Sequence, residues 1–237
     1  MRTQEIKLET ADGPMRVYEA APDEDAAGAV IVIQEAFGVN DHIEDVTRRF
    51  AVTGYHAVAP ALFHRTGGGT ADYDSFDKVV EWMTALTDEG MLADVDATVA
   101  YLNSQGFDNA QIGTVGFCMG GRVTFLVAAR RALGAAVGFY GGGIVTPRFP
   151  HLARLIDEAA ELRTPWLGLF GDADTGIPVD DVEALRDALT TAPEANEIVR
   201  YPDAEHGFHC DHRPAYHPEA AADGWRRTLA WFDTHLG

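Results

Sequence analysis

The chain has 237 residues, of which 46% are hydrophobic and 23% are charged, so it can bury a sizeable core and does not have the composition of a disordered protein. It carries 18 Lys and Arg against 37 Asp and Glu, a formal net charge of −19, which argues against nucleic acids and anionic membranes as partners. Two cysteines cannot form a disulfide scaffold, and no stretch is apolar enough for a signal peptide or a membrane span, so we expect a cytoplasmic protein.

Strands and helices alternate along the whole chain after an N-terminal hairpin. Alternating or continuous apolar runs predict strands at residues 4–9, 15–19, 29–33, 55–59, 112–115, 135–140, 166–170 and 197–201. Amphipathic spacing predicts helices at residues 41–53, 75–87, 90–104, 119–133, 151–162, 178–190 and 218–236. We therefore predict one α/β domain, residues 1–237, with a single doubly wound, mostly parallel sheet and helices on both faces.

The segment 111–123, QIGTVGFCMGGRV, carries the clearest chemical signal. A short β run leads into Gly116-x-Cys118-x-Gly120, the pattern of a nucleophile elbow with cysteine in place of the more usual serine. The sharp turn brings backbone close to the flanking positions, which therefore require small residues. At the start of the next helix, free N–H groups favour a thiolate and can hold an oxyanion. Similar glycine-rich turns bind phosphates, however, and a buried cysteine is often only a core residue.

Four reactive side chains come at the C-terminal ends of four predicted strands. They are Glu35, Cys118, Asp174 and His206. Because the C-terminal ends of parallel strands share one edge of the sheet, we expect these side chains to converge. The chain order nucleophile, acid, histidine is that of α/β-hydrolases. In that arrangement His206 handles the thiol proton and Asp174, in preference to Asp172, orients the imidazole.

Several strings together resemble the dienelactone hydrolase family. They are QEAFGVN at 34–40, GFCMGG at 116–121, GDADTGIP at 171–178 and HGF at 206–208. Their order and spacing cover nearly the whole chain, and the combination is far more specific than any one of them. The resemblance implies an α/β-hydrolase fold and the hydrolysis of a small ester or lactone, with no cofactor.

The resemblance also assigns roles to individual residues. The matching positions are Cys118, Asp174 and His206 for the triad, the backbone N–H groups of Ala36 and Met119 for the oxyanion hole, and Glu35 for an acidic residue that contacts the resting cysteine. The reaction would pass through a thioacyl enzyme. A carboxylate beside the thiol would keep it protonated until substrate displaces the carboxylate, which would limit oxidation of the nucleophile.

The family's carboxylate-binding arginines are not at their usual positions. The residue four positions after the histidine is Cys210, and the helix at 75–87 contains neither an arginine nor a tyrosine. Arg65 and Arg213 are candidate replacements, or else solvated loop residues. Four aromatic residues could form an apolar cleft for uncharged esters or lactones, or could belong to the core: Phe37, Phe63, Tyr140 and Phe208.

The competing hypothesis is a non-catalytic thiol protein that senses redox state or binds a metal. Cys210 lies in a histidine-rich stretch, from His206 to His212, which resembles a transition-metal ligand set, and Cys210 could pair reversibly with Cys118. No second ligand pair at structural-zinc spacing is present, so we predict no metal. We expect a small-molecule substrate as the partner, and a monomer or weak homo-oligomer.

Overall fold

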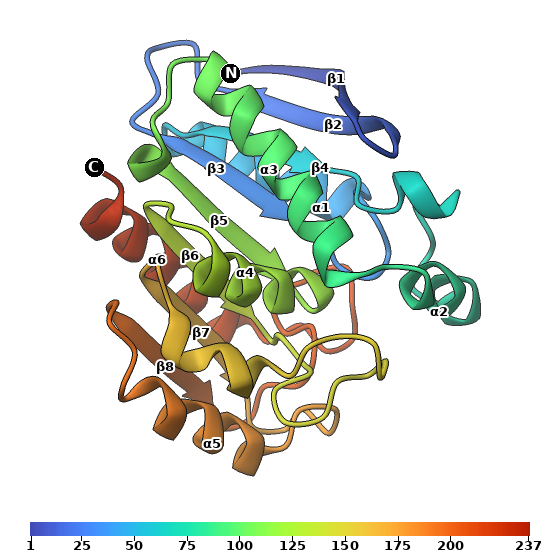
Figure 1. Ribbon diagram of the computed structural model, residues 1–237, viewed down its shortest axis with the longest axis vertical. Coiled ribbons are helices and arrows are strands. Elements are labelled where there is room, and N and C mark those ends of the chain that lie inside the picture. The colour runs from blue at the N-terminus through green and yellow to red at the C-terminus, as the bar shows by residue number, and fades with distance from the viewer.

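All eight strands join one sheet in the order β1-β2-β4-β3-β5-β6-β7-β8 (Figure 1). The computed structural model describes residues 1–237. Its strands are β1 (Arg2–Thr10), β2 (Gly13–Ala21), β3 (Ala29–Ile33), β4 (His56–Pro60), β5 (Ile112–Phe117), β6 (Ala135–Phe139), β7 (Trp166–Gly171) and β8 (Asn196–Tyr201). The pairs β1–β2 and β2–β4 are antiparallel, and every other pair is parallel. The predicted mostly parallel sheet and its edge hairpin are confirmed.

Helices cover both faces of this sheet. They are α1 (Asp41–Val52), α2 (Phe76–Thr84), α3 (Asp88–Ser104), α4 (Met119–Arg130), α5 (Val179–Leu189) and α6 (Pro218–His235). The chain steps from β3 to β4 in one direction along the sheet and from β5 to β6 in the other. Because such crossovers are right-handed, α1 and α4 lie on opposite faces. Figure 1 shows α3 and α4 in front of the sheet and α1 and α6 behind it. No helix is both long and apolar enough to cross a bilayer.

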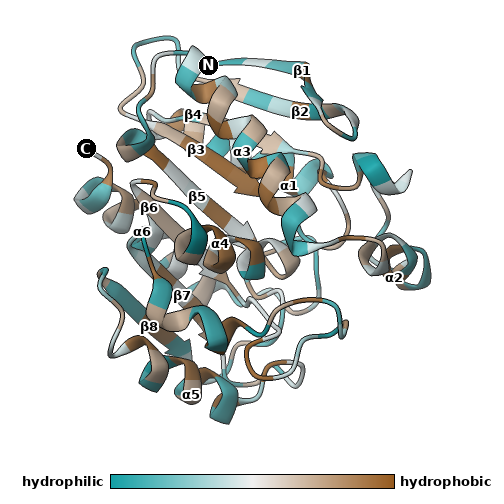
Figure 2. Cartoon of the chain, in the orientation of Figure 1, coloured by the Kyte–Doolittle hydropathy of each residue, from teal (hydrophilic) through white to brown (hydrophobic).

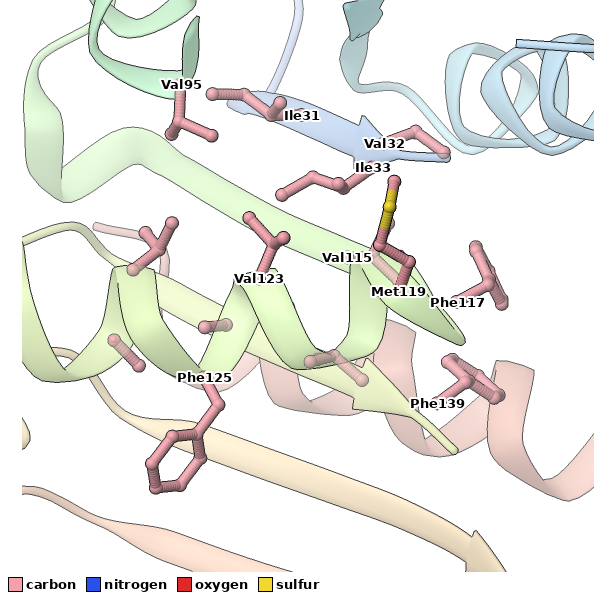
Figure 3. Packing of buried hydrophobic residues seen from close by; sticks show 14 of the residues in the cluster. Ile31, Val32, Ile33, Val95, Val115, Phe117, Met119, Val123, Phe125 and Phe139 are labelled. Atoms are coloured by element: carbon pink, nitrogen blue, oxygen red, sulfur yellow. The ribbon is translucent and has the colours of Figure 1, made fainter. Parts of the chain in front are cut away.

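The central strands are apolar because helices cover both of their faces. Every residue of β3 and of β5 is buried, whereas none of edge strand β1 is, and Figure 2 shows β3 as hydrophobic and β1 as largely hydrophilic. Helix α4 is buried from Met119 to Ala129. In Figure 3, Met119 and Val123 lie on the side of α4 that faces Ile33. Since each such apolar side chain contributes about 1.5–3 kcal/mol on burial, α4 is held firmly against the sheet.

Several predicted element boundaries differ from the structure, and the hydrogen bonds explain two of these differences. The helix expected at 151–162 is only a 3-10 segment, Leu155–Glu161, because the backbone N–H groups of residues 153 and 155 bond to partners outside it. Helix α4 ends at Arg130 rather than near residue 133, since the N–H of Leu133 instead donates to Thr164. Helix α1 begins at Asp41 as predicted, and its N-cap is Asn40, whose side chain accepts from the N–H of Ile43.

Candidate active site

Cys118 occupies a strained turn between β5 and α4. Its φ is 55° and its ψ is −112°, a backbone conformation that few non-glycine residues adopt outside functional sites. A Cβ at Gly116 would lie 2.2 Å from the carbonyl oxygen of Gly120, and a Cβ at Gly120 would lie 2.3 Å from that of Ile33. Both glycines are therefore required by close backbone packing, and the turn has the geometry predicted for a nucleophile elbow.

His206 and Asp174 form a short hydrogen bond from the loops after β8 and β7. His206 Nδ1 lies 2.6 Å from Asp174 Oδ2, and Asp174 Oδ1 accepts the N–H of Gly176 at 2.8 Å. Asp174 is buried. Burial by itself would lower the pKa of His206, but the neighbouring Cys118 sulfur and the Asp174 carboxylate outweigh burial and raise this pKa to about 10. The imidazole is thus held in place and favoured in its protonated form.

Asp172, the other acid of this loop, has a different partner. Both of its carboxylate oxygens accept from Arg200, at 2.7 and 2.8 Å. A guanidinium that donates to both oxygens fixes the orientation of the Asp172 carboxylate toward Arg200. The structure therefore pairs His206 with Asp174, the acid that the sequence pattern favours, and not with Asp172.

The backbone N–H groups of Ala36 and Met119 have no hydrogen-bond partner in the protein, and both residues lie beside Cys118. Both residues line one cavity together with Cys118 and His206, and neither N–H makes a hydrogen bond within the protein. For Met119 this follows from its position as the first residue of α4, since the opening N–H groups of a helix have no partner in the helix. Two unsatisfied donors beside a thiol can receive an oxyanion.

Glu35 is fully buried behind the cavity and does not line it. Burial raises the pKa of its carboxyl, and Arg213 and His206 lower it by smaller amounts. The hydroxyls of Tyr73 and Tyr140 donate to it, each at 3.4 Å, and an Arg213 nitrogen lies at 3.7 Å. No hydrogen bond joins Glu35 to Cys118. The carboxylate bonds to two phenols and lies near a guanidinium instead, so the expected contact with the resting cysteine is not made through a hydrogen bond.

Arg213 lies behind the His206 loop rather than in the cavity. Its guanidinium lies over the rings of Tyr73 and Phe37, at 5.5 and 5.9 Å from their centroids, and against the backbone of Gly207. Arg65 is also unavailable to a substrate, because it forms a two-pronged ion pair with buried Asp94 at 2.6 and 2.7 Å. Neither candidate carboxylate anchor reaches the cavity.

The cavity that contains Cys118 has a volume of about 690 Å³, and half of the residues that line it are hydrophobic. Apart from Ala36 and Met119, its apolar side chains come from α2, the turn between α2 and α3, the start of α3, the segment after β6 and the loop after β7: Phe76, Met83, Leu86, Met91, Pro147, Phe149, Leu152 and Ile177. Arg148 also lines it, stacked at 5.1 Å over the ring of Phe76 and without an acidic partner. A second, more polar groove of about 750 Å³ at the start of α1 contains none of the four reactive residues.

None of the four aromatic residues predicted to form the cleft lines this cavity. Phe63 packs on Trp82, and Phe208 is fully buried among other aromatic rings. Phe37 lies beneath Arg213, and Tyr140 is buried between Glu35 and His206 with a φ of 40°. These residues belong to the core. The actual lining was missed because Phe76 and Phe149 lie outside every motif, and only folding brings their segments together.

The histidine-rich stretch does not form a metal site. His209 is fully buried among aromatic rings, and burial lowers its pKa to about 3, whereas His212 is exposed. No group of three or more His, Cys, Asp or Glu side chains is arranged to hold a metal ion. Cys210 is a buried free thiol beside the hydroxyl of Tyr73 at 3.2 Å, and burial raises its pKa to about 11. The metal-binding alternative therefore loses its ligand set.

Comparison with known proteins gives one consistent result. The sequence profile of the dienelactone hydrolase family matches residues 15–236. A Methylorubrum extorquens protein named "Putative carboxymethylenebutenolidase" is 40% identical over 236 residues, which span 96% of this chain and 79% of that protein. The carboxymethylenebutenolidase of Pseudomonas putida is 29% identical over 237 residues, 97% of this chain and 95% of its own. The crystal structure of a "Putative Dienelactone Hydrolase" from Klebsiella pneumoniae superposes with a TM-score of 0.90 at 39% identity, over 99% of each chain.

Proposed function

The chain belongs to the dienelactone hydrolase family, and on this premise we propose that it hydrolyses a small carboxylic ester or lactone with Cys118 as the nucleophile. The observation that carries the proposal is the 2.6 Å bond between Asp174 and His206, with His206 beside the sulfur of a strained elbow. Acyl transfer by a thiol needs a positioned base, an orienting group for that base and an oxyanion site. The cavity that contains Cys118 is lined by a candidate for each: His206 as the base, Asp174 as the orienting group, and Ala36 and Met119 for the oxyanion site.

The first half of the proposed reaction makes a thioacyl enzyme. The Cys118 sulfur, paired with protonated His206, attacks the carbonyl carbon, and the carbonyl oxygen becomes an oxyanion held by the N–H groups of Ala36 and Met119. The tetrahedral intermediate collapses with cleavage of the ester C–O bond. His206 gives its proton to the leaving oxygen, and Asp174 keeps the imidazole aligned throughout.

The second half regenerates the thiol by hydrolysis. Neutral His206 takes a proton from a water molecule, which attacks the thioester carbonyl, and the same two N–H groups hold the second oxyanion. Collapse breaks the carbon–sulfur bond and releases the acid. The positive His206 then again pairs with the Cys118 thiolate. Each turnover consumes one water and needs no redox change and no cofactor.

The lining of the cavity bears on the substrate class. Its apolar walls suit a hydrocarbon portion of an ester or lactone. Arg122 is already paired with Asp88, so Arg148 is the arginine of the lining that remains available to a substrate carboxylate. A neutral ester needs no such partner, and the proposal therefore covers both neutral and singly charged substrates.

The test is hydrolysis of p-nitrophenyl acetate, a neutral lactone and a dienelactone by the wild type and by Cys118→Ala. Turnover that disappears in Cys118→Ala supports the proposal, and turnover that persists in it contradicts the role of the thiol. Thiol titration before and after a mild oxidant separates the redox alternative: a rapid Cys118–Cys210 disulfide together with no turnover of any substrate would favour a sensor.

A further inference from the structure

A buried ion pair lies beside the cavity and takes no part in the proposed chemistry. Arg122, one turn along α4 from Cys118, donates to both carboxylate oxygens of Asp88, at 2.6 and 3.2 Å. Asp88 is the first residue of α3, and both side chains are almost fully buried. Arg122 also lines the cavity. The pair thus ties the helix that begins at the nucleophile to the start of α3.

The same pair holds a third segment through its backbone. The carbonyl oxygen of Ala153 accepts from Arg122 Nη2 at 2.7 Å, and the N–H of Ala153 donates to Asp88 Oδ2 at 2.7 Å. Ala153 therefore bonds to both ions with both of its main-chain polar groups. A carboxylate and a guanidinium that each serve two partners form a rigid junction.

The segment held in this way is one wall of the cavity. We name residues 141–154 the wall loop; it contains no helix or strand. Its members in the cavity lining are Gly142, Gly143, Thr146, Pro147, Arg148, Phe149 and Leu152. Its base is closed by the N–H of Leu155, which donates to the Gly143 oxygen at 3.1 Å. Toward the opposite wall, the hydrogen bonds are those of His151 to the Leu86 carbonyl at 2.9 Å and of Ala153 to the ion pair, and Arg148 also lies over the ring of Phe76 at 5.1 Å.

Stability alone is a weak reason for such a pair. Taking two charges out of water has a large desolvation penalty, and a buried ion pair often stabilises a fold no better than apolar residues of similar volume would. The ion pair does fix the distance between the segments that carry Arg122 and Asp88, because a two-pronged guanidinium–carboxylate contact is directional. Here those distances join the nucleophile helix, the start of α3 and the wall loop.

From this geometry we infer that Asp88 and Arg122 are positioning residues that set the width of the cavity next to Cys118 and thereby select the size of the substrate. The inference rests on the proposed function for its substrate, an ester. Loosening the pair releases the wall loop and displaces the apolar surface that contacts a long acyl chain. An acetyl group is the shorter acyl chain of the two and therefore depends least on that wall.

The experiment compares p-nitrophenyl acetate with p-nitrophenyl hexanoate for Asp88→Asn, Arg122→Lys and a matched control, Asp94→Asn. Asp94 is also on α3, is fully buried and also forms a two-pronged pair with an arginine, Arg65, but neither residue of that pair lines the cavity. The two asparagine variants lose a buried negative charge, and Arg122→Lys keeps its charge but loses the two-pronged contact. The loss of stability in each variant is measured by urea denaturation.

We expect the hexanoate-to-acetate ratio of kcat/KM to fall at least tenfold in Asp88→Asn and in Arg122→Lys, mainly through KM, and to stay at the wild-type value in Asp94→Asn. An unchanged ratio in either pair variant that folds would overturn the inference. So would an equal fall in Asp94→Asn, because that result would reflect general loosening. If one pair variant fails to fold, the other supplies the ratio.

A second readout keeps this inference separate from the proposed hydrolysis. Alkylation of Cys118 by N-methylmaleimide and by N-cyclohexylmaleimide measures access past the wall loop without any ester cleavage. If the wild type hydrolyses no ester, the proposed function fails and the alkylation ratio still decides the role of the pair. A cyclohexyl-to-methyl ratio that changes severalfold in Asp88→Asn and not in Asp94→Asn supports the inference, and identical ratios in the two variants refute it.

Discussion

Replacing Asp174 with asparagine removes the charge that faces His206 and almost none of the volume. The 2.6 Å bond from His206 Nδ1 to the carboxylate is charge-assisted, and such bonds contribute about 1.5–3 kcal/mol. Loss of this bond disfavours the protonated His206 that pairs with the attacking Cys118 sulfur, so it lowers kcat/KM by roughly 10- to 150-fold, since about 1.4 kcal/mol corresponds to a factor of ten. An amide that favours the wrong imidazole tautomer would enlarge the loss further.

The fold should tolerate this substitution. The amide oxygen of asparagine can still accept the N–H of Gly176, which Asp174 accepts at 2.8 Å. We therefore expect the free energy of unfolding to fall by no more than the about 1.5–3 kcal/mol of the bond to His206, which leaves the protein folded. Hydrolysis of p-nitrophenyl acetate from pH 5 to pH 10, together with urea denaturation at pH 7, measures both quantities.

Asp172→Asn is the matched control, because Asp172 is two positions away and pairs with Arg200 instead. It should keep kcat/KM within about threefold of the wild type, in line with the small contribution of a partly exposed ion pair. The reasoning is refuted if Asp174→Asn retains wild-type kcat/KM while Cys118→Ala is inactive, or if Asp172→Asn causes the larger loss.

Four further outcomes follow from the structure. Gly116→Ala should fold poorly or not at all, measured by soluble yield and thermal unfolding, because its Cβ would lie 2.2 Å from a carbonyl oxygen. Phe208→Ala should lose about 3–5 kcal/mol of unfolding free energy in urea, because the ring is fully buried in the core and does not line the cavity. Arg148→Gln should lower kcat/KM for a carboxylate-bearing substrate about tenfold relative to a neutral ester, and equal effects on both would exclude Arg148 as the anchor. Glu35 has a folded-state pKa above its ordinary value of 4.5, so its ionisation opposes folding as pH rises through 4.5 and above; Glu35→Gln should therefore gain stability relative to the wild type between pH 4.5 and pH 8, and a difference independent of pH would contradict this.

The order of the reactive residues could be predicted from sequence because each depends on a local pattern. Glycines at positions 116 and 120 are needed at any turn this sharp, and they identify Cys118 without knowledge of the rest of the fold. The apolar run of β3 likewise identifies a strand covered on both faces. Right-handed crossovers then bring the strand ends to one edge, so the convergence of Cys118, Asp174 and His206 follows from topology alone.

The substrate cavity could not be predicted in this way, since its walls combine helices α2 and α3 with two loops that lie far apart along the chain. An aromatic residue has the same hydrophobicity in a core as in a cleft, so the sequence leaves both locations open for Phe63 and Phe208, and only the structure assigns them to the core. Arg213 and Arg65 carry the charge that a substrate carboxylate needs, but both already have partners in the protein. Arg213 lies near Glu35 and over the ring of Tyr73, and Arg65 pairs with Asp94.

What the amino-acid sequence by itself determined is the order of strands and helices, the elbow and the identity of the three residues that meet there, because backbone sterics and hydrophobic periodicity act over a few positions. Only the tertiary structure decided that Glu35 bonds to Tyr73 and Tyr140 and that Asp88 and Arg122 both bond to Ala153 of the wall loop. These outcomes depend on which charged and polar groups are left to pair after the backbone has packed, and such pairings join residues that lie far apart along the chain.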